Sequence, residues 1–438
     1  MRIGLDARSL TMPRPRGTGR NLLDAYRLIP RLRPAWQFVL YHQRPLPADL
    51  VGPPSQPAGA SRMPGPPDGL WRSPNARFRR IDMPGDRLDA WFQVRLPLAA
   101  RGDEVDLLHF PANAAPAWCP IPFVITIHDL IPLRLGGELS PRRTRAFRRG
   151  VRRGIRRAVH IITVSAATRD ELEQEFGVPR HKVTVIPWAP DSHVQSRDRA
   201  TALEQRHQVR EKYRLGQRWL LSFSGSTPRK NADGVLAGFA RVRPELRADV
   251  DVVLVGCEPA ERRAHLATLA ERLGIAQQCR ILGFAPHGDL PALLGGAAGL
   301  LMPSRYEGFG LPILDAFACD VPVLTSYVSS MPEVAGDAAV YCDPDDPESI
   351  AAGIEQLLHA PTAAALVERG RARLARFSWE HTAKAMCAVY EQCLVGRACA
   401  ANSECRIQNS EFERPARTNS EFSIQNTAFR TSPHEGCA

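Results

Sequence analysis

SRYEGFGLPILDAFACDVPVLTS, residues 304–326, sets Glu307 and Asp315 on either side of a glycine and proline turn that opens a helix. Main-chain N–H groups are free at such a helix start, and the helix dipole favours an anion there. The residues that would present these groups are Phe309, Gly310 and Leu311. Glu307 can accept sugar hydroxyls beside the anion, so the stretch suits a sugar phosphate. The alternative is a strand, turn and helix connection whose glycines only form the turn.

Buried strands alternate with helical stretches on both sides of this motif, as in parallel sheets covered by helices. In the first half we predict strands at residues 2–6, 37–41, 107–110, 123–128, 160–164 and 182–186. In the second half we predict them at residues 219–224, 250–256, 279–283, 299–303 and 321–325. The pattern predicts an α/β fold with two doubly wound, Rossmann-like domains and a ligand in the deep cleft between them.

The domain organisation follows from composition. We predict a first domain at residues 1–195, a linker at 196–217, a second domain at 218–377, a closing helix at 378–395 and a tail at 396–438. The density of proline and glycine in residues 43–90 indicates a long loop within the first domain. Ser378 can serve as N-cap of the closing helix. Approximate polar repeats in the tail predict disorder.

The chain of 438 residues is 44% hydrophobic and can bury two cores. Its ten cysteines form no CxxC pair and no cluster with metal-ligand spacing, which favours reduced thiols. A buried strand is predicted almost from Met1, which leaves no room for a secretory leader. We therefore expect a cytoplasmic location.

The net charge of +11 is carried almost entirely by arginine and concentrates in one predicted helix. PRRTRAFRRGVRRGIRR, residues 141–157, contains nine arginines and no acid. Phe147, Val151 and Ile155 recur every fourth position and form one apolar stripe. The face that we expect to contact an anionic membrane surface comprises Arg142, Arg145, Arg149, Arg152 and Arg156. The alternative is a solvated basic helix, and no nucleic-acid-binding motif accompanies the charge.

Three further segments carry residues suited to a diphosphate or a sugar. In SGSTPRKN, residues 224–231, a predicted strand leads into a small-residue loop with Arg229 and Lys230, which suit a diphosphate. VITIHDL, residues 124–130, ends a predicted strand at His128, which is either structural or part of the site. Gly17 and Gly19 would let the backbone approach the diphosphate from the other domain. Leu22 replaces the third glycine of a dinucleotide fingerprint, which excludes that motif.

The stretch that begins at Ser304 resembles the donor motif of the retaining glycosyltransferases of family 4, which have the GT-B fold. In that motif a second glutamate follows the first by eight positions, whereas this chain has Asp315 there. The resemblance implies that Glu307 contacts the donor sugar and that residues 309–311 meet the sugar and diphosphate. It further implies that Asp315 holds the ribose. Because aspartate is one methylene shorter than the glutamate of the family motif, its carboxylate is set back by roughly 1.5 Å.

By the same resemblance, Arg229 and Lys230 clamp the departing diphosphate and His128 reaches the donor sugar. The first domain is then the acceptor side and the second the nucleotide-sugar side. We expect a hexose, with mannose as a candidate, to move from a nucleoside diphosphate sugar to a glycan or lipid-linked acceptor in cell-surface polysaccharide synthesis. The resemblance implies catalysis without cofactor or metal. The triplet Asp249-Val-Asp251 imitates a metal-binding DxD but is interpreted as the start of a strand.

Two other classes remain open at this stage. A nucleotide-sugar epimerase can share the two-domain fold, although the Glu307 motif argues against it. A nucleotide-sugar-binding scaffold without catalysis is suggested by Asp315 and by Asp320, where glycine is commoner in the family. His109 is expected to line the cleft or to lie in the core.

Overall fold

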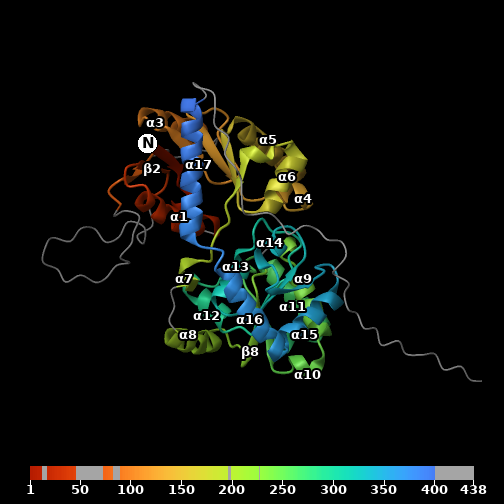
Figure 1. Ribbon diagram of the computed structural model, residues 1–438. Coiled ribbons are helices and arrows are strands. Elements are labelled where there is room, and N and C mark those ends of the chain that lie inside the picture. Colours follow the sequence, from red (N-terminus) through yellow and green to blue (C-terminus); the bar gives the residue numbers. More distant parts are fainter. Residues whose placement is uncertain (12–16, 46–72, 82–88, 196–198, 226, 400–438) are drawn as a thin grey trace, which may run out of the picture.

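The structure is a computed structural model that describes residues 1–11, 17–45, 73–81, 89–195, 199–225 and 227–399. Figure 1 shows two lobes, one formed by the first half of the chain and one by the second. Each lobe is built on one parallel sheet covered by helices. The predicted α/β fold with two doubly wound domains is therefore confirmed.

The sheet of the N-terminal lobe has seven parallel strands in the order β3-β2-β1-β4-β5-β6-β7. The strands are β1 Arg2–Asp6, β2 Gln37–His42, β3 Ala76–Arg80, β4 Leu107–Phe110, β5 Phe123–Ile127, β6 His160–Thr163 and β7 Val183–Val185. Every residue of β4 and β5 is buried. Central parallel strands are covered on both faces, which explains their continuous apolar sequences.

The sheet of the C-terminal lobe has six parallel strands in the order β10-β9-β8-β11-β12-β13. The strands are β8 Arg218–Ser222, β9 Val250–Leu254, β10 Cys279–Ile281, β11 Gly299–Met302, β12 Val323–Ser326 and β13 Ala339–Cys342. The strand order reverses between β8 and β11, which pair directly with Gly299 opposite Leu220. Ligands of open parallel sheets bind at the carboxyl ends of strands at such a reversal.

The helices connect successive strands. Those of the N-terminal lobe are η1 Arg8–Thr11, α1 Gly17–Leu32, η3 Trp91–Arg95, α3 Leu96–Gly102, α4 Ile131–Arg134, α5 Pro141–Arg157, α6 Ala166–Phe176 and η4 Arg180–Lys182. Those that follow are α7 Ser192–Gln195, α8 Arg199–Lys212, η5 Pro228–Lys230, α9 Ala232–Arg241, α10 Pro244–Arg247, α11 Ala260–Arg272, η6 Ala276–Gln278, η7 His287–Asp289, α12 Leu290–Gly295, α13 Leu311–Ala318, α14 Met331–Ala335, α15 Pro347–Leu358, α16 Ala360–Leu374 and α17 Trp379–Cys399.

Helix α17 returns from the C-terminal lobe to the N-terminal lobe and lies beside α1 (Figure 1). Ser378 caps it by accepting a hydrogen bond from the backbone N–H of His381 at 3.1 Å, as predicted. The Tyr390 hydroxyl lies 2.8 Å from Nδ1 of His109, and Glu391 pairs with Arg33 at 2.7 Å. The last helix of the chain is thus bound to the first lobe.

Three elements differ from the sequence prediction. Strand β3 lies inside the range interpreted as a loop. The sequence did not predict it, because its residues ARFRR are mostly arginine and lack the apolar run of a buried strand. Strand β13 was not predicted, and helix α8 lies within the range interpreted as a linker. Helix α17 continues past residue 396, while residues 46–72 of the predicted loop and 400–438 of the predicted tail lie outside the described residues.

Across the described ranges, no single helix has the length and apolar composition needed to cross a membrane. Pro347–Leu358 and Ala360–Val395 meet the requirement only as a pair, and that pair is bent by 87°.

Candidate functional site

Three charged side chains meet at the reversal of strand order in the C-terminal lobe. The Glu307 carboxylate lies 2.7 Å from Nη1 of Arg229 through one oxygen and 2.7 Å from Nζ of Lys230 through the other. The two cations follow β8 and the carboxylate follows β11, which are neighbouring strands. The sequence placed each at the carboxyl end of a strand, and the topology brings them together. This cluster is called the Glu307 triad below.

Backbone contacts fix the two loops that carry the triad. The Arg305 N–H donates to the Arg229 carbonyl at 2.8 Å, and Arg229 Nη1 donates to the Tyr306 carbonyl at 3.1 Å. The Ser304 hydroxyl donates to Glu307 at 3.0 Å. A fixed cluster of this kind needs little rearrangement when a ligand binds, which lowers the entropy cost of binding.

The electrostatics of Glu307 depend on its two cationic neighbours. Burial disfavours its charge, but Lys230 and Arg229 outweigh that cost and lower the pKa of Glu307 below its ordinary value. The side chain is 9% exposed. The lowered pKa favours the ionised carboxylate, which can accept hydroxyl groups, and the two cations beside it suit a negatively charged ligand.

The glycine turn precedes helix α13 as predicted. Gly310 has φ +111°, a conformation that favours glycine, and α13 begins at Leu311 with Pro312 in its first turn. The Ser330 hydroxyl bonds to the carbonyls of Glu307 and Phe309 at 2.9 and 2.8 Å. These contacts hold the start of α13 beside the Glu307 triad.

The same turn touches the N-terminal lobe. A Cβ atom at Gly308 would lie 2.5 Å from the His128 carbonyl oxygen, so only glycine allows this approach. The Ser165 hydroxyl donates to the Gly308 carbonyl at 2.8 Å. The Glu333 carboxylate from α14 accepts the N–H groups of Ala166 and Ala167, at 2.8 and 3.2 Å, at the start of α6. The candidate site is therefore assembled from both lobes.

His128 follows β5 and contributes an imidazole to this junction. Its Nε2 lies 2.5 Å from the Pro111 carbonyl oxygen, which can only accept, so Nε2 carries the proton. Nδ1 is buried and, among the described residues, has no hydrogen-bond partner. Burial lowers the pKa of His128 to about 4, against the hydrogen bond to Pro111, which raises it. A neutral imidazole thus offers an unused lone pair.

Asp315 lies in α13, where one of its oxygens accepts the Asp191 N–H at 2.9 Å. Burial raises the pKa of Asp315 to about 7; the hydrogen bond from Asp191 lowers it and the Asp191 carboxylate raises it. Asp315, which stands where the family motif has glutamate, therefore contacts the segment that connects the two lobes.

We predict that Asp315 makes the stability of the protein depend on pH. Between about pH 4 and pH 7 the folded protein keeps a proton on Asp315 that the unfolded chain has lost, so this contribution is complete below pH 4 and disappears as the pH rises through 7. The measurement is the Tm of wild type minus the Tm of Asp315→Asn as a function of pH. This difference should fall between about pH 4 and pH 7 and stay level above pH 7. Asp320→Asn, at an exposed ion pair with Arg371, should show no such fall. A constant difference for Asp315→Asn would contradict the prediction.

Three site residues were not found in the sequence. Glu138, in the loop before α5, lies 3.8 Å from Nε of Arg229. The Tyr306 hydroxyl donates to Glu171 of α6, which also pairs with Arg134 at 3.5 Å. Burial raises the pKa of Glu171, against the Tyr306 hydrogen bond. The signal available for Glu138 was an acid four positions before the first arginine of the basic run. In the sequence, Glu171 resembles any other helical acid.

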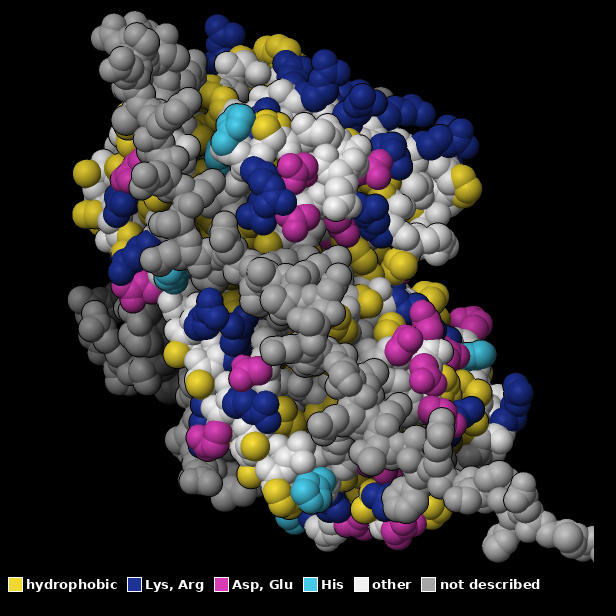
Figure 2. All heavy atoms as spheres, turned by 45° about the vertical axis from the view of Figure 1, so that its right-hand side comes forward, with side chains coloured by type: hydrophobic (Ala, Val, Ile, Leu, Met, Phe, Trp, Pro, Cys, Tyr) yellow, Lys and Arg dark blue, Asp and Glu magenta, His cyan; other side chains and the backbone are white. Residues whose placement is uncertain are grey.

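The remaining predicted site residues lie elsewhere. Gly17 and Gly19 lie in the first turn of α1, and residues 12–16 before them are outside the described residues. Their approach to a diphosphate stays a prediction. All nine arginines of α5 are exposed, while Val151 and Ile155 are buried. In Figure 2 a row of basic side chains follows the upper edge of the N-terminal lobe, the region of α5 in Figure 1.

Two residues have structural partners. His109 is fully buried, with Nε2 2.8 Å from the Thr126 hydroxyl, and burial lowers its pKa to about 3. His109 was expected either to line the cleft or to lie in the core, and the structure places it in the core. Asp251 accepts the Gly216 N–H at 2.7 Å within β9, in agreement with a strand rather than a DxD motif. Nowhere in the described chain do three His, Cys, Asp or Glu side chains gather as a metal ion would need.

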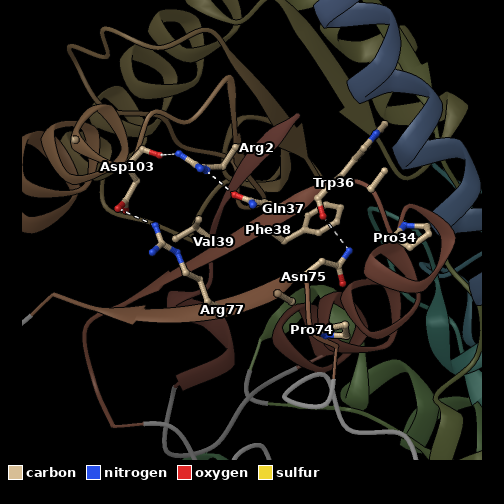
Figure 3. Close-up of a pocket in the computed structure, with 13 residues that line it drawn as sticks. Arg2, Pro34, Trp36, Gln37, Phe38, Val39, Pro74, Asn75, Arg77 and Asp103 are labelled. Carbon is tan, nitrogen blue, oxygen red and sulfur yellow. Dashed lines mark hydrogen bonds and ion pairs between the residues drawn. The ribbon is translucent and has the colours of Figure 1, made fainter.

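A hollow of about 670 Å³ lies at the opposite end of the first sheet (Figure 3). It is lined by the starts of β1, β2 and β3 and by the end of α3. Its polar groups bond to one another: Arg77 to Asp103 at 2.8 Å and Arg2 to Gln37 at 2.9 Å. The hollow is thus separate from the carboxyl ends of the strands and from the Glu307 triad.

Comparison with known proteins supports this picture. Residues 56–192 match the family model of Glycosyltransferase Family 4, and residues 205–373 match that of Glycosyl transferases group 1. The chain is 36% identical over 261 residues to O-antigen chain mannosyltransferase B of Escherichia coli, covering 59% of this chain and 67% of that protein. It is 30% identical over 264 residues to the serotype-specific mannosyltransferase WbdA of Escherichia coli, covering 59% of this chain and 32% of that protein.

Among solved structures, the chain resembles Anabaena Alr3699/HepE in complex with UDP-glucose, with a TM-score of 0.64. The match covers 89% of this chain and 99% of that chain at 17% identity. At this identity the resemblance concerns the fold.

Proposed function

The chain belongs to the glycosyltransferases of family 4 and group 1, and we propose that it moves a hexose from a nucleoside diphosphate sugar to a glycan or lipid-linked acceptor. The observation that carries this proposal is the Glu307 triad at the reversal of strand order. Negative charge grows on the departing diphosphate during sugar transfer. Cations fixed beside that position stabilise the transition state more than the ground state.

In the proposed complex, the diphosphate lies beside the Glu307 triad, where Arg229 and Lys230 contact it without leaving their positions. Arginine offers a planar fork and lysine a point charge, a pair suited to two phosphate groups. Glu307 then accepts hydroxyls of the donor sugar. Nδ1 of His128 accepts a further sugar hydroxyl, because its lone pair has no partner among the described residues. Asp315 serves the ribose, and Phe309, Gly310 and Leu311 present backbone N–H groups to the donor.

We infer a retaining reaction without a metal ion or other cofactor. Two cations already face the proposed diphosphate, so the chain itself supplies the charge that a divalent ion would provide. In a front-face reaction the acceptor hydroxyl attacks from the side of the leaving phosphate, whose oxygen takes the proton. Contacts across the lobes, such as Ser165 with Gly308, would exclude water from the donor.

We propose mannose as the first donor sugar to test, with a role in cell-surface polysaccharide synthesis. The support is that the two relatives described above are both named mannosyltransferases, one of them for the O-antigen chain. The resembling HepE structure holds UDP-glucose, so uridine donors form the second set. We also propose a cytoplasmic location, in keeping with the proposed use of nucleotide-activated sugars.

The decisive experiment combines donor binding and transfer by the full chain. Thermal unfolding is measured with GDP-mannose, UDP-glucose, UDP-GlcNAc, GDP and UDP, with and without EDTA, because a ligand of the folded state must raise Tm. The expected result is a selective rise that survives EDTA, followed by transfer of the radiolabelled sugar to lipid extracts or glycans with its anomeric configuration retained. Selective binding without transfer would favour a scaffold. Conversion of the donor without an acceptor would favour an epimerase.

We further propose that α5 contacts an anionic membrane surface. Its nine arginines are all exposed, although Arg148 pairs with Glu175, and it buries Val151 and Ile155 against its own lobe, so most of the cationic face can meet phosphate groups. Contact through α5 would hold a peripheral enzyme at the inner face of the membrane, where lipid-linked acceptors would be available.

Neutralising five arginines of α5 is expected to weaken vesicle binding at least 100-fold, because each contributes about 1 kcal/mol near an anionic surface. The variant replaces Arg142, Arg145, Arg149, Arg152 and Arg156 by glutamine. Sedimentation with vesicles of phosphatidylglycerol measures the affinity. A matched control replaces five exposed arginines of the C-terminal lobe by glutamine: Arg241, Arg243, Arg272, Arg369 and Arg371. Equal losses in the two variants would show a general charge effect and contradict a role for α5.

A further inference from the structure

The chain crosses between the lobes through residues 187–192, here called the crossover, which several helices hold. Thr382 and Trp379 of α17 donate to the carbonyls of Pro187 and Pro190, at 2.7 and 2.8 Å. Two further bonds hold its end. Asp315 of α13 accepts the Asp191 N–H at 2.9 Å, and Asp24 of α1 accepts the Ser192 hydroxyl at 2.9 Å. Helices of both lobes thus fix the crossover along its length.

Trp188 lies in the middle of the crossover and contacts the imidazole of His128. The ring centroids are 4.9 Å apart with an angle of 58° between the planes. Trp188 is 8% exposed, and Trp379 of α17 lies behind it at 6.5 Å. The crossover therefore packs the indole of Trp188 against His128, a residue of the candidate donor site.

His128 needs such a neighbour because its other contacts leave its ring incompletely held. Its N–H donates to Asn113 at 2.6 Å and its carbonyl accepts the Thr168 hydroxyl at 3.2 Å, which fixes the backbone. On the imidazole, the bond from Nε2 to Pro111 is the one polar contact found among the described residues. A single bond does not prevent rotation of the ring about it. The indole of Trp188 packs against the imidazole, with ring centroids 4.9 Å apart, and so opposes that rotation.

We propose that Trp188 is a positioning residue for His128, which it holds with Nδ1 directed to the donor sugar. The proposal rests on the proposed function for the contact between His128 and the donor. The packing between the two rings stands independently of it. Since the crossover also carries the N–H that bonds Asp315, one short segment connects the sugar end and the ribose end of the proposed donor site.

Removal of the indole should affect transfer through His128 alone. In Trp188→Ala the imidazole gains space and water, and misplacement by about 1 Å of a group that contacts the substrate costs on the order of 100-fold. We expect kcat to fall 10- to 100-fold with donor Kd changed less than threefold, since Arg229 and Lys230 are untouched. Trp188→Phe keeps an aromatic face and should restore most of kcat.

A double-mutant cycle separates positioning from general destabilisation. If Trp188 acts through His128, Trp188→Ala combined with His128→Ala should be no slower than His128→Ala alone. The control is Trp36→Ala, also at a residue 8% exposed in the N-terminal lobe, which packs on Phe38 at 6.1 Å and should combine additively with His128→Ala. Additive losses for Trp188, or a normal rate for His128→Ala, would overturn the proposal while sugar transfer by the wild type still supports the proposed function.

A second measurement needs no transfer activity. In protein labelled with ¹⁵N-histidine, the His128 signals are assigned by their loss in His128→Ala. Wild type should show a single neutral tautomer with the proton on Nε2, and Trp188→Ala should show averaging of the two nitrogen shifts. An unchanged spectrum in a folded Trp188→Ala variant would overturn the proposal whatever the enzyme's donor proves to be.

Discussion

Glu307→Gln is expected to lower sugar transfer at least 100-fold while the affinity for nucleoside diphosphate is kept or increases. Glutamine has nearly the same shape but no charge, so it accepts sugar hydroxyls weakly and no longer neutralises Arg229 and Lys230. Loss of a preorganised electrostatic contact at the reacting sugar costs roughly 100- to 1000-fold in kcat. The freed cations attract the diphosphate more strongly, because their intramolecular partner has lost its charge.

The same change should destabilise the empty protein. Removing one member of a buried ion pair leaves uncompensated charge and costs about 3–5 kcal/mol. Here two cations lose their partner at 2.7 Å, so Tm should fall, and nucleoside diphosphate should restore part of it. The control is Glu348→Gln, in an exposed pair with Arg241, which should leave Tm and transfer almost unchanged. Normal transfer by a folded Glu307→Gln variant would remove Glu307 from the proposed mechanism.

Lys230→Met is expected to produce the second large effect, a loss of about 100-fold in kcat/KM. The lysine is 18% exposed and its ammonium lies in the Glu307 triad, so methionine keeps the packing and deletes the charge that would face the leaving group. The loss should extend to binding. Wild type should prefer nucleoside diphosphate over nucleoside monophosphate, and this preference should shrink in the variant because the second phosphate loses a cation.

Isothermal titration with the nucleotides and initial rates with the identified donor measure both effects. Lys384→Met provides the control, since Lys384 is 59% exposed in a surface pair with Glu380. An unchanged preference for the diphosphate in Lys230→Met would place the phosphate elsewhere. Equal losses in both variants would indicate an unspecific effect of charge.

Much of the fold was predictable because its signals are local. The strand at residues 107–110 and the helix at residues 141–157 were predicted with the bounds that the structure has, since one is a continuous buried run and the other an apolar stripe among arginines. Strand β3 escaped because an edge strand needs no apolar run, and the sequence ARFRR has the charge of a surface loop.

The candidate site was predicted as a set of residues but not as an arrangement. Arg229, Lys230, Glu307 and His128 were found because each lies at or just after the end of a predicted strand, and Asp315 was found by its place eight positions after Glu307 in the family motif. Their roles remain predictions. Glu138, Glu171 and Trp188 were missed, because an acid in a loop or on a helix and a tryptophan after a strand have no periodic pattern that marks them.

The sequence by itself determined the alternation of strands and helices, the glycine turn that opens α13, the N-cap at Ser378 and the cationic face of α5. These depend on residues within a few positions of one another, whose backbone preferences and side-chain periodicity act locally. Only the tertiary structure decided that Glu307 lies between Arg229 and Lys230, that Asp315 bonds the crossover and that Trp188 packs on His128. Such contacts depend on which strands pair and on how the lobes meet, and those choices are made by the packing of the whole chain.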